Sequence, residues 1–158
     1  MIDGLRQVRD ADGEQLCALI GGIFAEYPGC VLEPEGQDRD LLALETFTAG
    51  TGGEMWVVER DGNVVACCGW SPYADGAIEL KRLYVGAPAR RQGLGAALTM
   101  RVEDVARARG ASAIELWSDT RFTDAHRLYE GQGFGRLPET RELHDASNSV
   151  EYHFRKQL

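Results

Sequence analysis

The sequence predicts an α/β (α+β) domain, in which a mixed, mostly antiparallel sheet of six or seven strands is flanked by about four helices. Three observations predict this class. Strand-like and helix-like patterns follow one another in the order β-α-α-β-β-β-α-β-α-β-β. An Asp-Gly pair between two apolar runs predicts a hairpin and therefore antiparallel strands. A long amphipathic pattern between two later strands predicts a crossover helix. The length of 158 residues suits one domain, here residues 3–158.

In the first half of the chain, the sequence predicts a strand and two helices, followed by a β-hairpin. Asp12 is placed to cap the first helix, and a Pro/Gly/Asp-rich loop at 28–40 separates it from the second. The hairpin turn is RDG (60–62), because Asp-Gly readily adopts the positive φ that such turns need. The expected elements are a strand at 5–9, helices at about 12–27 and 41–47, and strands at 54–59 and 63–70.

The second half predicts strands that alternate with two helices. Leu94, Leu98, Val102 and Val105 recur at spacings of four, four and three, which is typical of an amphipathic helix ending at Gly110. The expected elements are strands at 77–85, 112–117, 133–137 and 149–156, and helices at 94–110 and 123–132.

Composition narrows the classes of function. A net charge of −8 argues against a general nucleic-acid binder and agrees with a cationic substrate such as an amine. No run of apolar residues is long enough to span a membrane, and the N-terminus has no apolar signal region, so we expect no membrane partner and a cytoplasmic protein. The four cysteines form no paired CxxC zinc motif, so we expect reduced thiols and no metal.

The stretch ARRQGLGAAL (89–98) places glycines and arginines at the start of the third helix. The N-terminus of a helix has unpaired N–H groups and partial positive charge, and glycine lets the backbone approach a phosphate closely. A Walker A loop is excluded because alanines follow Gly95, and a dinucleotide fingerprint fails because Leu98 occupies the third small position. A phosphate cradle is the favoured interpretation, and a surface turn is the alternative.

This loop resembles the signature Gln/Arg-x-x-Gly-x-Gly/Ala of the GNAT superfamily of N-acetyltransferases, with Arg90, Gly93 and Gly95 in its fixed positions. ELKRLYV (79–85) is similar to the central strand of that family, and LYEGQGF (128–134) to its Leu-Tyr-x-x-x-Gly-Phe segment. The resemblance implies a GNAT-like sheet with a splayed cofactor cleft between the fourth and fifth strands. It also implies acetyl-CoA as cosubstrate, with the loop holding its pyrophosphate.

The resemblance implies backbone contacts from Leu83 and Val85 to the pantetheine arm, a role that is compatible with core packing of their side chains. The expected cofactor-binding residues are Leu83, Tyr84, Val85, Arg90, Arg91, Gln92, Gly93, Leu94, Gly95 and Ala96. Many relatives carry an asparagine where this chain has Phe122, so its bond to the pantetheine arm is either lost or supplied by Thr123, Asp124 or Ser118.

Two residues are expected to carry the catalysis. Tyr129 occupies the acid position of the family and would protonate the departing thiolate; packing on the sheet is its alternative role. Glu79, expected on the same face as Lys81 and Leu83, is either a base for the amine or the partner of Lys81 in an ion pair. His126 is expected to be a solvated residue on a helix face rather than a base.

The function implied is transfer of an acetyl group from acetyl-CoA to a primary amine, by direct attack in a ternary complex. The acceptor is a small molecule or a peptide, and its specificity is expected in the first two helices and the loop at 28–40. A non-catalytic acyl-CoA-binding or regulatory domain is the alternative, and a dinucleotide-binding oxidoreductase is a distant third. The sequence does not decide between a monomer and a homodimer.

Overall fold

A computed structural model describes residues 1–158 of the chain. The strands form a seven-stranded sheet: β1 (Leu5–Gln7), β2 (Glu54–Arg60), β3 (Asn63–Pro72), β4 (Ile78–Val85), β5 (Ala113–Asp119), β6 (Gly135–Glu142) and β7 (Val150–Gln157). The α-helices are α1 (Gly13–Phe24), α2 (Leu44–Thr51), α3 (Leu94–Ala108) and α4 (Thr123–Gly131). None of these helices combines the length and apolarity needed to cross a membrane.

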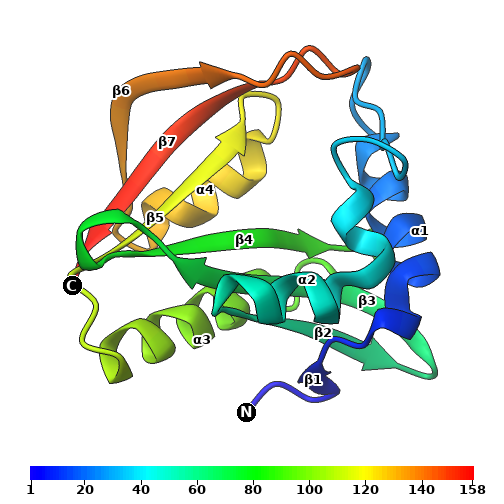
Figure 1. The fold of residues 1–158 in the computed structure, drawn as a ribbon, viewed down its shortest axis with the longest axis horizontal. Helices are drawn as coiled ribbons and strands as arrows, with labels where there is room; N and C mark the ends of the chain where they lie inside the picture. The colour runs from blue at the N-terminus through cyan, green and yellow to red at the C-terminus, as the bar shows by residue number, and fades with distance from the viewer.

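The sheet has the strand order β1-β2-β3-β4-β5-β7-β6, and every neighbouring pair is antiparallel except β4 and β5. The predicted element order and the mostly antiparallel sheet are therefore confirmed. The hairpin turn is also as predicted, because Asp61 and Gly62 both have positive φ, at 51° and 78°. In Figure 1, β4 and β5 start close together on the left and diverge toward the right.

Helices cover both faces of the sheet and create two apolar cores. On one face, the core includes Leu98 of α3, Tyr129 of α4 and Phe154 of β7. On the other, it includes Ile20 of α1, Leu44 of α2 and Val57 of β2. Adjacent Cys67 and Cys68 lie in different cores and both are free thiols, as their place on one strand predicts.

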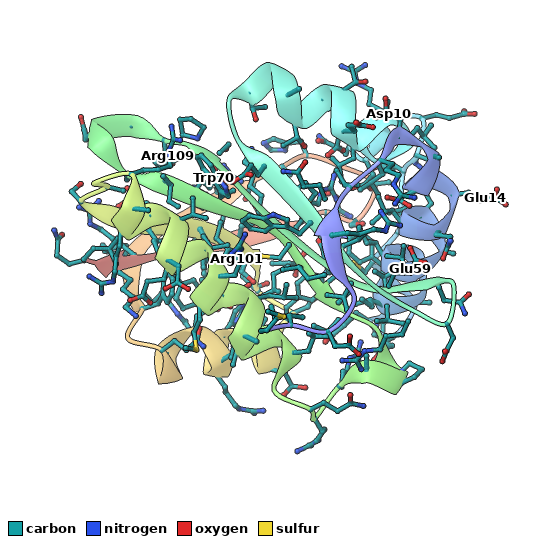
Figure 2. The ribbon with its side chains drawn as sticks, turned by 90° about the horizontal axis from the view of Figure 1, so that it is seen from below. Asp10, Glu14, Glu59, Trp70, Arg101 and Arg109 are labelled. Atoms are coloured by element: carbon teal, nitrogen blue, oxygen red, sulfur yellow. The ribbon has the colours of Figure 1, made fainter.

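Cations on α3 also contact the sheet. The Arg101 and Arg109 guanidinium carbons lie 5.3 and 4.7 Å from the ring centroids of Trp56 and Trp70. Figure 2 shows Arg109 beside Trp70. These contacts join the middle and the C-terminal end of α3 to β2 and β3.

Several predicted boundaries shift, and one predicted cap is only partly as expected. Asp12 is the N-cap residue of α1, but its side chain makes no capping bond to the helix, because its carboxylate accepts hydrogen bonds from Arg6 at 2.8 and 2.9 Å and from the Arg9 N–H at 2.8 Å. The second helix is preceded by a 3-10 turn at Arg39–Ala43 and ends at Thr51, with Gly52 as its C-cap at a φ of +78°. Strand β6 extends beyond the expected 133–137, because it pairs with β7 as far as Glu142.

Candidate active site

The divergence of β4 and β5 creates the candidate site. Only Ile78–Ile114 and Glu79–Glu115 pair across these strands, so the remainder of β4 has no neighbour on that side. A cavity of about 630 Å³ occupies the opening and is lined by both strands, α1, α4 and the loops at 37–40 and 143–149. This volume lies within the range of small-molecule and cofactor sites. The splayed cleft expected from the sequence is confirmed.

A β-bulge in β4 shapes one wall of the cavity. Lys81 pairs with Gly69 and Tyr84 pairs with Cys67, so Arg82 and Leu83 together lie opposite a single residue of β3. Arg82 has a φ of +54°, an uncommon conformation for a residue with a side chain. The bulge reverses the alternation of side chains between the two faces of the sheet. Leu83 therefore packs in the same core as Leu80. The expectation that Glu79, Lys81 and Leu83 share one face is therefore wrong for Leu83.

The loop before α3 has the properties of an anion site. Arg91 and Gly93 have positive φ, at 62° and 75°, and Gly93 is the N-cap of α3. The first main-chain bond at this end joins the Ala97 N–H to the Gly93 carbonyl, and the N–H groups of residues 91–96 donate no hydrogen bond within the protein. A row of free N–H groups at the positive end of a helix matches a phosphate in charge and in hydrogen bonding. The residues present therefore fit the pyrophosphate of a coenzyme A thioester.

Arg90 has partners within the protein. Its Nε donates to the Val85 carbonyl at 2.9 Å, and its two terminal nitrogens donate to the Glu26 carboxylate at 2.7 Å each. The Glu26 carboxylate holds the pKa of Arg90 above its usual value. Arg90 thus ties the cradle loop to the end of α1, and a phosphate must compete with Glu26 for it.

Glu26→Gln is expected to tighten acetyl-CoA binding by about two- to fivefold at low salt, because it frees Arg90 and removes a negative charge beside the cradle. Titration calorimetry at low and high salt checks this, and the gain should shrink as salt rises. Glu35→Gln, which removes an exposed carboxylate from the loop at 28–40, is the control for net charge. Weaker binding by Glu26→Gln would show that Arg90 serves only to hold the loop in place.

Tyr129 lies where α4 meets the cavity. Its side chain is 4% exposed, lines the cavity, and packs against Phe134 and Phe154 with ring centroids 5.8 and 5.7 Å away. Burial, with smaller effects from Cys68 and Tyr84, raises the pKa of Tyr129 well above its usual value. The phenol therefore stays protonated at neutral pH, as a proton donor must be. Both roles weighed from the sequence, acid and packing residue, are compatible with this position.

Glu79 lies on β4 just where β5 departs, and it lines the same cavity. Its side chain is 14% exposed, and Lys81 Nζ is 3.8 Å from its carboxylate. Burial raises the pKa of Glu79, and Lys81 and Arg141 act in the opposite direction. A carboxylate with a raised pKa in a cavity is a better base than a solvated one.

His126 differs from the expectation. It is 4% exposed rather than solvated, its Nε2 lies 3.1 Å from Ser118 Oγ, and burial lowers its pKa. The physical reason is its position three residues before Tyr129, on the same buried face of α4. Ser118 lines the cavity, so the imidazole reaches the cavity only through this hydroxyl.

Phe122, at the position where many relatives carry an asparagine, belongs to a cluster of aromatic rings. Its ring centroid lies 5.0 Å from Tyr27, 6.0 Å from Phe24 and 6.4 Å from Tyr84, so the cluster joins α1, β4 and the start of α4. All four rings line the cavity. Of the three residues expected to replace the missing hydrogen bond, Ser118 and Asp124 line the cavity and Thr123 does not.

The loop between β6 and β7 closes one side of the cavity. The Ser147 hydroxyl accepts from the Val31 N–H at 2.8 Å and donates to the Val31 carbonyl at 3.1 Å, while the Ala146 N–H donates to Glu33 at 3.2 Å. Figure 1 shows this loop, at the top, reaching the segment that follows α1. Residues more than a hundred positions apart in the chain thus share a wall.

The structure brings only part of the expected cofactor set to the cavity. The expected residues that line it are Glu79, Leu83, Tyr84, Val85, Arg90, Gly95 and Tyr129. Arg91, Gln92, Gly93, Leu94 and Ala96 form the loop and first turn at its edge. The residues that sequence reasoning missed are Arg82, Asp38, Asp40 and Ser147. A signal for the bulge existed, because the apolar alternation changes phase between Leu80 and Leu83. Asp38 and Asp40 lie in the loop at 28–40, which was expected to select the acceptor, but neither residue was singled out, and nothing in the sequence pointed to Ser147.

Comparison with known proteins gives a consistent family. The sequence model of the Acetyltransferase (GNAT) family matches residues 20–134. A mycothiol acetyltransferase of Beutenbergia cavernae is 39% identical over 130 residues, which is 79% of this chain and 42% of that protein. An N-acetylaspartate synthetase of Danio rerio is 31% identical over 121 residues, which is 76% of this chain and 42% of that protein. The chain therefore spans less than half the length of these relatives.

Solved structures share the fold at low sequence identity. An acetyltransferase of the GNAT family from Staphylococcus aureus Mu50 aligns with a TM-score of 0.81 and 19% identity, covering 98% of both chains. The PaiA N-acetyltransferase of Thermoplasma acidophilum, in complex with coenzyme A, aligns with a TM-score of 0.75 and 17% identity, also covering 98% of both chains. With the family match across most of its length, the splayed sheet and the cradle before α3, this chain belongs to the GNAT family of acetyltransferases.

Proposed function

We propose that the protein transfers an acetyl group from acetyl-CoA to a primary amine by direct attack in a ternary complex. The observation that carries the proposal is the conjunction of the free N–H groups at 91–96 with a cavity that holds both Glu79 and Tyr129. A domain that only binds acyl-CoA would need the cradle. It would not need a partly buried carboxylate and a buried phenol lining the same cavity.

Different parts of the cleft would bind different parts of acetyl-CoA. The loop before α3 would hold the pyrophosphate through its N–H groups, and β4 from Leu80 onward would offer backbone groups to the pantetheine arm. When bound, acetyl-CoA supplies a thioester that is reactive toward amines. The wall of aromatic rings around Phe122 would keep water away from that arm.

The proton balance of the reaction gives a role to each of the two proposed catalytic residues. In the overall reaction a C–N bond forms, the C–S bond breaks, the amine loses a proton and the departing sulfur gains one. Glu79 would accept the proton of the amine, directly or through water, and Tyr129 would donate a proton to the sulfur.

The cysteines support direct transfer over a covalent acyl-enzyme. Cys68 is fully buried, as is Cys67, whose pKa burial raises to about 12, so neither supplies a thiolate. Cys30 does line the cavity, but burial raises its pKa as well. No cysteine in the site has the lowered pKa of an activated nucleophile.

The acceptor is proposed only as a primary amine, free or on a peptide. The relatives named for mycothiol and for N-acetylaspartate differ in acceptor, so similarity to them does not choose one. A screen of amines of different charge and size, followed by release of free thiol from acetyl-CoA, tests the proposal. Binding of acetyl-CoA without thiol release for any amine would favour the non-catalytic alternative.

Gly95→Val is expected to weaken acetyl-CoA binding by about tenfold or more, equivalent to about 1.4 kcal/mol. A Cβ at Gly95 would lie 3.2 Å from Leu128 Cδ2 and would crowd the first turn of α3, where the phosphate must approach. Calorimetry measures the dissociation constant. Gly22→Val is the matched control, because a Cβ there meets open space on α1. Unchanged affinity in a folded Gly95 variant would remove the cradle from the account.

A further inference from the structure

The ion pairs of Arg82 join the two sides of the cavity. Arg82 Nη1 lies 3.0 Å from Asp38 Oδ1, and Nη2 lies 2.7 Å from Asp40 Oδ1. The three side chains are 17%, 11% and 14% exposed, and all three line the cavity. One guanidinium therefore ties the segment between α1 and α2 to the bulge of β4.

Both ends of this connection make further contacts within their own walls. At the β4 end, the Arg82 carbonyl accepts a bond from Cys67 Sγ at 3.2 Å, and Cys67 is fully buried. At the other end, Asp38 Oδ2 accepts the Glu33 N–H at 2.9 Å, and Leu41 is fully buried just beyond it. Each end is thus anchored within its own wall, and the two ion pairs of Arg82 bridge the walls.

The two walls have different proposed tasks. Leu83, adjacent to Arg82 in the bulge, lies in the stretch of β4 proposed to hold the acyl-bearing arm. The segment at 37–40 belongs to the region expected to select the acceptor, and it contributes to the cavity lining. Arg82 adopts its positive φ at the junction, and uncommon backbone conformations persist where the surroundings fix them, commonly at functional sites.

We propose that Arg82 is a positioning residue, which holds the acceptor wall (37–40) at a fixed distance from the acyl-bearing stretch of β4. The inference rests on the proposed acetyl transfer. It assigns Arg82 no contact with the reacting atoms. Its guanidinium is engaged by two carboxylates, so its contribution is the geometry of the amine relative to the acetyl carbonyl.

The experiment compares Arg82→Met with the charge-balanced triple variant Arg82→Met/Asp38→Asn/Asp40→Asn. The single variant leaves two poorly exposed carboxylates without their partner and is expected to lose stability. The triple variant removes that penalty without restoring the connection, so it keeps the test valid if the single variant fails to fold. In the triple variant, kcat/KM for the best amine should fall about 10²-fold, through a higher acceptor KM and a lower kcat. The dissociation constant of acetyl-CoA should stay within about twofold of wild type, because the proposed cofactor contacts are backbone groups.

Arg6→Met is the matched control. Arg6 makes a comparable pair of bonds to Asp12, at 2.8 and 2.9 Å, and is 20% exposed, but it does not line the cavity. Its loss should leave both KM values and kcat unchanged. Wild-type acceptor KM and kcat in the triple variant would overturn the proposal, as would an equal loss of acetyl-CoA affinity. If wild-type protein released thiol with no amine, the acetyl transfer itself would fail, and this inference with it.

Discussion

Tyr129→Phe is expected to lower kcat by about 10²-fold while the fold and the affinity for acetyl-CoA are retained. The phenol is buried in the cavity wall and its pKa is raised, so at neutral pH it is a protonated donor. General acid catalysis is worth about 10²–10⁴-fold, and the lower end is expected because a thiolate with a pKa of about 8.5 leaves fairly well unassisted. Phenylalanine keeps the ring contacts with Phe134 and Phe154, so only the proton donor is lost.

Tyr84→Phe is the control for this change. Tyr84 is also a tyrosine of the cavity lining, and removal from water raises its pKa as well. Steady-state and pre-steady-state rates of thiol release, measured where chemistry limits the rate, separate the two variants. Full kcat in a folded Tyr129→Phe variant would reduce Tyr129 to a packing residue. Loss of kcat in Tyr84→Phe alone would move the acid to β4.

Glu79→Gln is expected to lower kcat/KM at neutral pH by about 10²-fold, because it removes the proton acceptor and keeps the shape. Burial raises the pKa of Glu79, so the wild-type profile should lose activity as pH falls through a value above the ordinary 4.3 or so of a glutamate. Above that pKa the carboxylate is ionised and active; below it the protonated form cannot accept a proton. The variant should lack this acid limb and should recover partly at high pH, as free amine becomes abundant.

Glu151→Gln provides a matched control for the loss of a carboxylate. Glu151 lines the same cavity, but Arg141 Nε donates to it at 2.7 Å, so it is already engaged. Its substitution should keep an acid limb but move it to lower pH, because the Glu151 charge is one of those that raise the pKa of Glu79. A Glu79→Gln profile that superimposes on wild type would return Glu79 to a structural role as the partner of Lys81.

Local patterns in the sequence predict the fold well, because each element depends on residues close together in the chain. The Asp-Gly turn, the helical repeat that begins at Leu94 and the glycine loop are such patterns, and all three appear where expected. The burial of His126 could also have been predicted, because His126 and Tyr129 lie on the same face of a helix.

The walls of the cavity could not be predicted in the same way. Arg82 meets Asp38 across more than forty residues of sequence, and Ser147 meets Val31 across more than a hundred. Such pairs depend on which loops lie close together in the folded chain. The hydrophobic periodicity of the sequence predicts single helices and strands, and it does not predict these contacts. The glycine loop could be predicted from the sequence, yet the bond from Arg90 to Glu26, two residues beyond α1, is again long-range.

The most direct test of the account follows labelled acetyl groups in a rapid-quench experiment with wild-type protein and its best amine. The account predicts that thiol release and acetylated amine appear at the same rate, and that neither occurs without the amine. It also predicts that no label is found on the protein, including on Cys30 in the cavity wall. Release of thiol before amine is added, with label on the protein, would contradict direct transfer from acetyl-CoA to the amine.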